Sequence, residues 1–266
     1  MGRPLCRHAT FHRLKAPHPT PLPHRLNSIS PQNCGHSGRS LYHFRLSHPI
    51  ESRSYDDAMA GISYQYTAAN TSASHSYLYP TVSRFLAQIP SGSIVLDAGC
   101  GNGTFLSRFQ DRGWHLHGSD FSPAGLEFAR QSFPHINFFL ADAQTPYSDF
   151  LSTTGPVDAL ISTEVIEHLY DPPRFLRNCY SLLKPGGTLV LTTPYHGYLK
   201  NLLLALSGKM EFHFDANRVH GHIKFFSRKT LERALTNAGV TGIQFAGAGR
   251  IPFAWKSMVL TATKPA

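Results

Sequence analysis

Two acidic residues and a histidine lie close together in STEVIEHLYDPP, residues 162–173. Glu164, Glu167 and His168 are spaced i, i+3 and i+4, so they share one face if this stretch begins a helix. Carboxylates and imidazoles ligate divalent cations, and histidine is also the commonest general base. Carboxylates in a first helical turn are favoured by the helix dipole as well. The sequence leaves three roles open: a metal site, an acceptor-activating or positioning group, and a stabilised helix end.

Three glycines alternate with other residues in VLDAGCGNGTF, residues 95–105. Gly99, Gly101 and Gly103 follow a strand-like apolar run that contains Asp97, and helix-like sequence comes next. Glycine at such a turn lets a ligand approach the backbone closely. The spacing is not the G-x-G-x-x-G of dinucleotide folds, and the Lys-Ser/Thr pair of a phosphate loop is absent. The loop therefore argues against a dehydrogenase or a nucleoside triphosphatase.

Two further acids follow the next two strand-like runs. Asp120 ends HLHGSD nineteen residues beyond Gly101, where a carboxylate can accept hydrogen bonds from both ribose hydroxyls. Asp142 ends INFFLAD, where it can accept from an exocyclic adenine amine. These positions predict a nucleoside-binding edge beside the glycine loop.

Short apolar runs alternate with helix-like sequence from residue 93 onward, which predicts parallel βα units in a doubly wound α/β fold. The expected strands are 93–99, 115–120, 136–142, 157–163 and 187–193. The run at 257–264 follows the run at 242–249 through a loop too short for a crossover helix. It should therefore enter the sheet antiparallel.

From about residue 75 to its end, the chain resembles the class I S-adenosylmethionine-dependent methyltransferases. The resemblance rests on the glycine loop, the two later acids, the motif LLKPGGTLVLTTP at 182–194 and the antiparallel last strand. It implies a Rossmann-like seven-stranded sheet, mostly parallel, with helices on both faces and S-adenosyl-L-methionine as cofactor. It also implies that Asp97 and the three glycines approach the amino-acid part of the cofactor, Asp120 its ribose and Asp142 its adenine.

Two subfamilies share the E-x-x-E-H pattern. The ubiquinone-biosynthesis O-methyltransferases look similar and would select His220 as a further metal ligand, whereas the small-RNA 2′-O-methyltransferases would select His222. The resemblance implies Mg²⁺ or Mn²⁺ bound by Glu164, Glu167, His168 and His222, with His220 as the alternative. In a metal-free site, His168 and Glu164 would be the catalytic residues.

The chain is expected to have two parts. Residues 1–58 form a basic extension rich in Pro, His and Ser, which should be disordered, and residues 59–266 form the catalytic domain. The first fifty residues contain seven Lys and Arg and no acid, so the formal charge of +9 falls to about +2 for residues 51–266. A cytoplasmic protein is expected, or a mitochondrial or plastid one if the extension is a transit peptide.

Two segments fall outside the alternation of strand-like and helix-like sequence. Residues 62–90 should form a helix beside the sheet whose aromatic residues, Tyr64, Tyr66, His75, Tyr77 and Tyr79, could close over the cofactor. Residues 195–226, called the insertion below, should overhang the ligand crevice and select the substrate. Their leucine run is also compatible with plain packing or with peripheral membrane contact.

The expected acceptor is a small apolar or phenolic molecule, methylated on oxygen. The near-neutral domain argues against a nucleic-acid acceptor, because a basic groove would be needed. The alternatives are a small-RNA 2′-O-methyltransferase and a catalytically silent, cofactor-binding assembly protein. No motif in the sequence encodes the oligomeric state.

Overall fold

The computed structural model describes residues 72–211, 214, 217 and 221–266. The chain divides into two units, Met1–Glu51 and Ser52–Ala266, and every described residue belongs to the second. The boundary predicted after residue 58 and the residues Tyr64, Tyr66 and His220 therefore lie outside the described residues.

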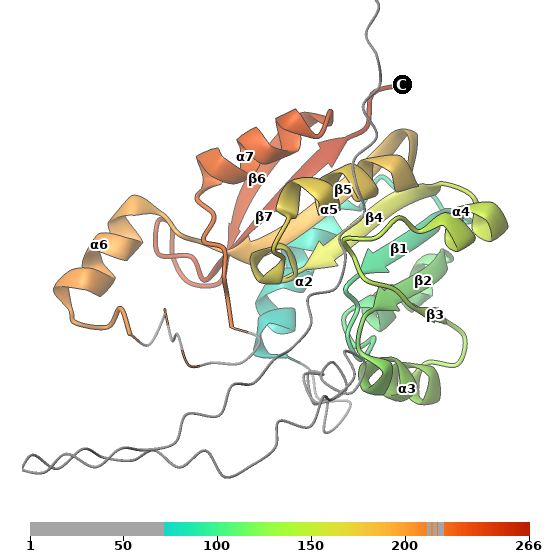
Figure 1. The fold of residues 1–266 in the computed structure, drawn as a ribbon, viewed down its shortest axis with the longest axis horizontal. Helices are drawn as coiled ribbons and strands as arrows, with labels where there is room; N and C mark the ends of the chain where they lie inside the picture. The colour runs from blue at the N-terminus through green and yellow to red at the C-terminus, as the bar shows by residue number, and fades with distance from the viewer. Residues whose placement is uncertain (1–71, 212–213, 215–216, 218–220) are drawn as a thin grey trace, which may run out of the picture. The chain divides into compact units, whose positions relative to one another are not determined.

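A seven-stranded sheet with the order β3-β2-β1-β4-β5-β7-β6 forms the centre of the described part (Figure 1). Its strands are β1 (Ile94–Ala98), β2 (His115–Asp120), β3 (Asn137–Leu140), β4 (Val157–Thr163), β5 (Leu183–Pro194), β6 (Thr241–Ala248) and β7 (Ser257–Thr263). β1 to β5 pair in parallel, and β7 pairs antiparallel with both β5 and β6. The predicted fold class and the antiparallel last strand are confirmed.

Helices cover both faces of the sheet (Figure 1). One face carries α2 (Ala73–Phe85), the 3₁₀ helix η1 (Leu106–Arg112) and α3 (Pro123–Ser132). The other carries α4 (Ser148–Thr154), α5 (Pro172–Leu182) and α7 (Arg228–Asn237). Each layer buries its own apolar cluster against the sheet, as expected when a sheet is hydrophobic on both faces.

The carboxyl ends of the parallel strands bring the predicted site residues to one edge of the sheet. β1 leads there into the glycine loop, β2 ends at Asp120, and β4 leads into Glu164. β7 runs the opposite way, and Ser257 at its start pairs with Pro194 at the end of β5. The beginning of β7 therefore contributes to the same edge.

The prediction that a helix begins at Glu164 is wrong. Glu164 has a left-handed φ of 55°, Ile166–His168 form a single 3₁₀ turn (η2), and α5 begins only at Pro172. Asp171 caps α5 by accepting the Arg174 backbone N–H at 3.0 Å, and proline suits the first helical position. The two glutamates are therefore outside a first helical turn, and a helix dipole does not explain them.

In its described residues, the segment between β5 and α7 carries one helix, α6 (Tyr198–Leu206), which extends away from the sheet in Figure 1. Its large apolar side chains are mostly exposed, whereas Lys200 is buried and donates to the backbone carbonyls of Tyr195 and Lys256. Among the described helices, none combines the length and the apolar character that a membrane crossing needs.

Candidate active site

The glycine loop is packed too tightly to accept side chains at two of its positions. Gly99 and Gly103 have φ values of +86° and +75°, a region that favours glycine. A Cβ on Gly99 would lie 2.4 Å from Val165 Cγ2, and one on Gly103 would lie 2.7 Å from Phe138. Because Val165 lies inside the EVIEH stretch, the glycine loop directly contacts the segment that carries Glu164, Glu167 and His168.

Asp97, in the strand that leads into the loop, is a buried acid without a partner. It is fully buried, and neither carboxylate oxygen has a hydrogen-bond partner among the described residues. Burial, together with the nearby Asp120 carboxylate, raises the pKa of Asp97 to about 8. Buried polar groups are normally paired, so such a carboxylate has the capacity to bind a cationic ligand group. The ammonium of an amino-acid-bearing cofactor fits this requirement.

Asp120 lies near Asp97, and its carboxylate already accepts hydrogen bonds from the backbone. Its oxygens accept the backbone N–H groups of Gly101 and Ser122, each at 2.8 Å, and the backbone N–H of Phe121 also lowers its pKa. Burial is the larger effect and raises the pKa overall. A carboxylate offers about four acceptor positions, so Asp120 retains capacity for a ribose hydroxyl.

Asp142 lies next to Asp120 at the same edge. The backbone N–H of Ala141 donates to the Asp120 carbonyl at 3.0 Å, and Asp142 itself is exposed and accepts the Gln144 N–H at 2.8 Å. Phe121 and Leu140, which flank these two acids, expose 51% and 58% of their surface. Large apolar side chains exposed beside two acids suit the faces of a planar base. Neither residue was singled out in the sequence, although Phe121 directly follows Asp120.

Glu164 is held by partners from distant strands. Its two carboxylate oxygens accept from the Thr192 hydroxyl at 2.9 Å and the Ser257 hydroxyl at 3.2 Å. Its backbone N–H donates to the Thr192 carbonyl and hydroxyl, which fixes the left-handed conformation. The Tyr77 hydroxyl of α2 also lies 3.2 Å from the Ser257 hydroxyl. Burial raises the pKa of Glu164 to about 7.

The other predicted aromatic residues of α2 do not all face this network. His75 lies 3.4 Å from the Thr104 hydroxyl, next to the glycine loop, and burial lowers its pKa to about 4. Tyr79 instead donates to the Arg108 carbonyl in η1 and packs on Phe105 and Phe109. Tyr79 therefore contributes to packing, whereas Tyr77 and His75 border the site.

Glu167 is fully buried, with only one of its oxygens satisfied. Oε2 accepts from the Thr193 hydroxyl at 2.9 Å, whereas Oε1 has no hydrogen-bond partner among the described residues and lies 3.9 Å from His168 Nε2. Burial and the neighbouring Glu164 raise the pKa of Glu167 well above its usual value. Its backbone carbonyl accepts the N–H groups of Ile223 and Lys224, each at 2.9 Å, which attaches the end of the insertion to η2.

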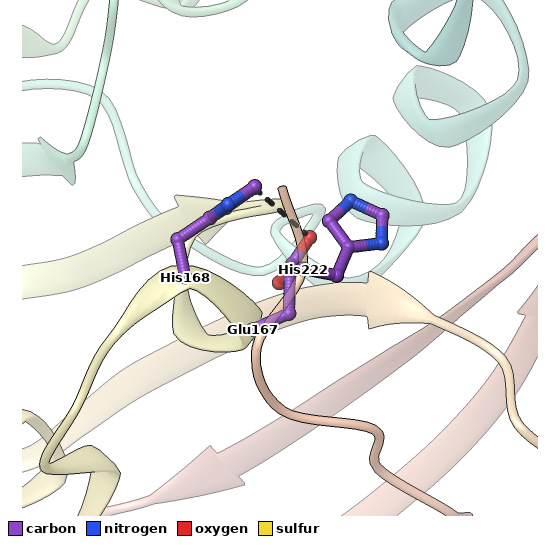
Figure 2. A group of neighbouring side chains, drawn as sticks. All are labelled: Glu167, His168 and His222. Carbon is purple, nitrogen blue, oxygen red and sulfur yellow. Dashed lines mark ion pairs between the residues drawn. The ribbon is translucent and has the colours of Figure 1, made fainter. Parts of the chain in front are cut away.

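His168 and His222 complete the group shown in Figure 2. His168 Nδ1 lies 3.2 Å from the Gly221 carbonyl, and the two imidazole rings are in edge-to-face contact at 4.9 Å. One potential ligand atom from each of Glu167, His168 and His222 lies within 4.8 Å of the others. Glu164 is not part of this group, because its oxygens face Thr192 and Ser257.

Sequence reasoning missed the hydroxyl groups that orient the two glutamates. Thr192 and Thr193 lie near the end of β5 and Ser257 starts β7, and all three are buried. In the sequence they read as ordinary strand residues. Only the pairing of β4, β5 and β7 shows that they face Glu164 and Glu167.

Comparison with known proteins agrees with this geometry. Residues 72–244 match the family described as a methyltransferase domain. A probable S-adenosylmethionine-dependent methyltransferase of Mycolicibacterium smegmatis is 32% identical over 41% of this chain and 41% of its own length. A ubiquinone biosynthesis O-methyltransferase of Vibrio parahaemolyticus is 29% identical over 58% of this chain and 68% of its own length.

A solved structure shares the fold. It is a putative methyltransferase of Haloferax volcanii in complex with the Trm112 methyltransferase activator, with a TM-score of 0.56 and 18% identity over 71% of this chain and 90% of that one. The match to the family model covers well over half of the chain. The chain therefore belongs to the methyltransferase-domain family, and it is a class I S-adenosylmethionine-dependent methyltransferase.

Proposed function

We propose that the protein methylates an oxygen atom of a small apolar or phenolic acceptor at the carboxyl edge of the sheet. The observation that carries this proposal is the contact between the glycine loop and Val165. It sets the cofactor-binding loop against the segment with Glu164, Glu167 and His168. The similarity to a ubiquinone biosynthesis O-methyltransferase supports an oxygen acceptor of this kind.

The residues of the loop edge fit S-adenosyl-L-methionine. Asp97 would pair with its ammonium group, Asp120 would accept from its ribose, and Asp142 would accept from its adenine amine, with Phe121 and Leu140 beside the base. When bound, the cofactor supplies a methyl group that is already strongly electrophilic. The protein must therefore align the acceptor oxygen, which can contribute about 7–11 kcal/mol, and remove its proton.

His168 is the residue best arranged to take that proton. A carbonyl oxygen only accepts, so the 3.2 Å contact with Gly221 places the hydrogen of a neutral ring on Nδ1. Nε2 is then the unprotonated ring nitrogen, which is the one that acts as the base. After proton transfer, the imidazolium would lie 3.9 Å from Glu167 Oε1, where its positive charge would favour ionisation of that buried carboxyl group. Glu164 acts by holding the acceptor edge through Thr192 and Ser257.

Replacing Asp120 tests the cofactor assignment. Asp120→Ala removes the acceptor for the ribose hydroxyls and leaves the Gly101 N–H without its partner, so affinity for S-adenosylmethionine should fall about tenfold or more. Calorimetric titration measures this, with the exposed Asp149→Ala as the control. An unchanged affinity in Asp120→Ala would remove Asp120 from the ribose site.

A divalent cation is the second candidate, and a specific observation favours it. Glu167 Oε1 is buried and has no hydrogen-bond partner among the described residues, and it belongs to the close group with His168 and His222. Mg²⁺ or Mn²⁺ bound there would lower the pKa of an acceptor hydroxyl. Glu164, which sequence reasoning included in the metal set, would act only as a neighbouring charge.

Manganese binding tests this candidate directly. Titration monitored by electron paramagnetic resonance should show one Mn²⁺ per chain, with affinity reduced about tenfold or more in Glu167→Gln and His222→Ala. Glu164→Gln should weaken binding less, because its carboxylate lies outside the group. An equal loss of Mn²⁺ affinity in all three variants, or no bound Mn²⁺ in the parent protein, would contradict this metal site. His168 would then act without a metal.

The insertion is the proposed contact with an apolar phase. Tyr198, Leu199, Leu203 and Leu206 expose between 50% and 84% of their surface along α6. An exposed apolar helix next to an acceptor site suits delivery of an apolar substrate from a lipid surface. Leu203→Glu/Leu206→Glu should abolish cosedimentation with phosphatidylcholine vesicles. Cosedimentation that persists in this variant would exclude α6 as the contact.

The cytoplasmic compartment remains a prediction from the sequence.

A further inference from the structure

A hollow in the surface lies outside the residues proposed to bind the cofactor and the acceptor. It has a volume of about 510 Å³ and lies between the beginning of α5, the helix α7 and residues 224–226. α5 and α7 lie side by side on the same face of the sheet (Figure 1). We call this hollow the α5–α7 groove.

Positive charge exceeds negative charge along the α5–α7 groove. Arg177, Lys224 and Arg233 line it, and Asp171 is its only acidic lining residue. Among the described residues, none of the three cations has an ion-pair partner. Asp171 cannot neutralise them fully, because its Oδ1 accepts the Arg174 N–H as the cap of α5. The groove therefore holds uncompensated cations that face one shared space.

The groove also offers aromatic surface. Tyr170 and Phe225 line it and expose 82% and 43% of their surface. Guanidinium groups bind carboxylate and phosphate groups through paired hydrogen bonds, and exposed rings contact planar apolar groups. The combination fits a small organic anion with an aromatic part better than it fits an inorganic ion.

The groove adjoins the proposed acceptor site through the backbone. Lys224, which lines the groove, donates its N–H to the carbonyl of Glu167. Tyr170 follows His168 by two residues, so η2 contributes to the acceptor site and leads directly to the groove. A ligand in the groove would therefore lie against the same short segment that carries the proposed base.

We propose that the α5–α7 groove is a binding site for the carboxylate or phosphate group of an aromatic small molecule. The group belongs either to the acceptor itself, at a distance from the methylated oxygen, or to a separate ligand that binds beside it. The first source rests on the proposed function, whereas binding in the groove does not.

Side-chain NMR tests the site without any turnover. In the full chain at low ionic strength, phenyl phosphate and benzoate should shift the arginine Nε–H signals of Arg177 and Arg233 saturably, and phenol should not. Arg177→Gln/Arg233→Gln should weaken this binding about tenfold or more, because both charge-assisted hydrogen bonds are lost. The matched control is Arg174→Gln, an exposed arginine on the same helix outside the groove, which should change affinity less than about twofold.

Three results would overturn the site: no saturable shift, equal binding of phenol, or equal affinity in the double variant. Thermal unfolding and binding of S-adenosylhomocysteine would show that the double variant is folded. Kinetics then separate the two sources. If the double variant has a raised KM for 3,4-dihydroxybenzoate but not for catechol, at unchanged kcat, the carboxylate bound in the groove belongs to the acceptor. Unchanged KM values with lost phenyl phosphate binding assign it to a separate ligand.

Discussion

His168→Ala should lower kcat for a phenolic acceptor by a factor of about 10²–10⁴, the usual contribution of a general base. The cause is the loss of Nε2, which is the unprotonated ring nitrogen when the contact with the Gly221 carbonyl holds the hydrogen on Nδ1. Transfer of a labelled methyl group to catechol measures the change. Affinity for S-adenosylhomocysteine should remain within about twofold, because His168 does not belong to the glycine-loop edge.

Two controls separate a base from a structural residue. His115→Ala removes an exposed histidine at the opposite end of β2 and should leave kcat unchanged. Imidazole added to the buffer should restore part of the activity of His168→Ala, since a small base can occupy the space that the ring leaves. A variant that keeps normal turnover would contradict the role of His168, and a variant that imidazole does not rescue would point to a positioning role.

Asp97→Asn should make the cofactor-free protein more stable at pH 8 and should abolish tight binding of S-adenosylhomocysteine. The pKa of Asp97 in the folded protein is about 8, against an ordinary value of 3.8, because the carboxyl is fully buried. The folded state therefore binds the proton more tightly than the unfolded state does. The contribution of Asp97 to the free energy of unfolding is complete below pH 3.8 and is lost as the pH rises towards 8.

The effect is large because the Asp97 carboxylate has no hydrogen-bond partner among the described residues. Between pH 5 and pH 8 the loss is on the order of 3 kcal/mol, which corresponds to roughly 5–10 °C in Tm for a chain of this size. Asp97→Asn cannot ionise, so its Tm should fall much less over this range. Thermal unfolding at the two pH values measures the difference, with the exposed Asp111→Asn as the control.

The same substitution removes the partner of the cofactor ammonium. Loss of one member of a buried charge pair costs about 2–5 kcal/mol, so affinity for S-adenosylhomocysteine should fall by a factor of about 30 or more. Parallel pH dependence in Asp97→Asn and the parent protein would show that Asp97 ionises normally. Retained affinity would show that the ammonium binds elsewhere.

The positions of the glycine loop and of the two later acids could be predicted because their signals in the sequence are local. Gly99 and Gly103 follow a strand and precede a helix, and their need for glycine arises within a few residues of backbone. Asp120 and Asp142 end the next two strands, and parallel strands carry their carboxyl ends to one edge. The antiparallel β7 was also predictable, because the loop that precedes it is too short for a crossover.

The acceptor edge was harder to predict because tertiary contacts determine it. Glu164 and Glu167 have helical spacing, yet Glu164 is held in a left-handed conformation by Thr192, and by Ser257, which lies 93 residues away. No local pattern records such partners. The true start of α5 did have a local signal, since an aspartate followed by Pro172 and Pro173 is a typical helix beginning.

The contact between His222 and His168 also depends on tertiary pairing that spacing alone does not reveal. His222 meets His168 because the backbone of Ile223 and Lys224 is bonded to Glu167, which fixes the register of the insertion on η2. His220 lies outside the described residues. The prediction of an acceptor site from these residue types remains a prediction, and the pairing of the insertion with η2 shows only that His222 contacts His168.

Calorimetric titration of the full chain with S-adenosylhomocysteine at pH 7 tests the central claim most directly. The account predicts saturable binding of one ligand per chain, lost when Gly99→Val forces a side chain against Val165 and strains the left-handed backbone of the loop. Binding that survives Gly99→Val, or no binding by the parent protein, would contradict a methyl-donor site at this edge and with it the proposed methyl transfer.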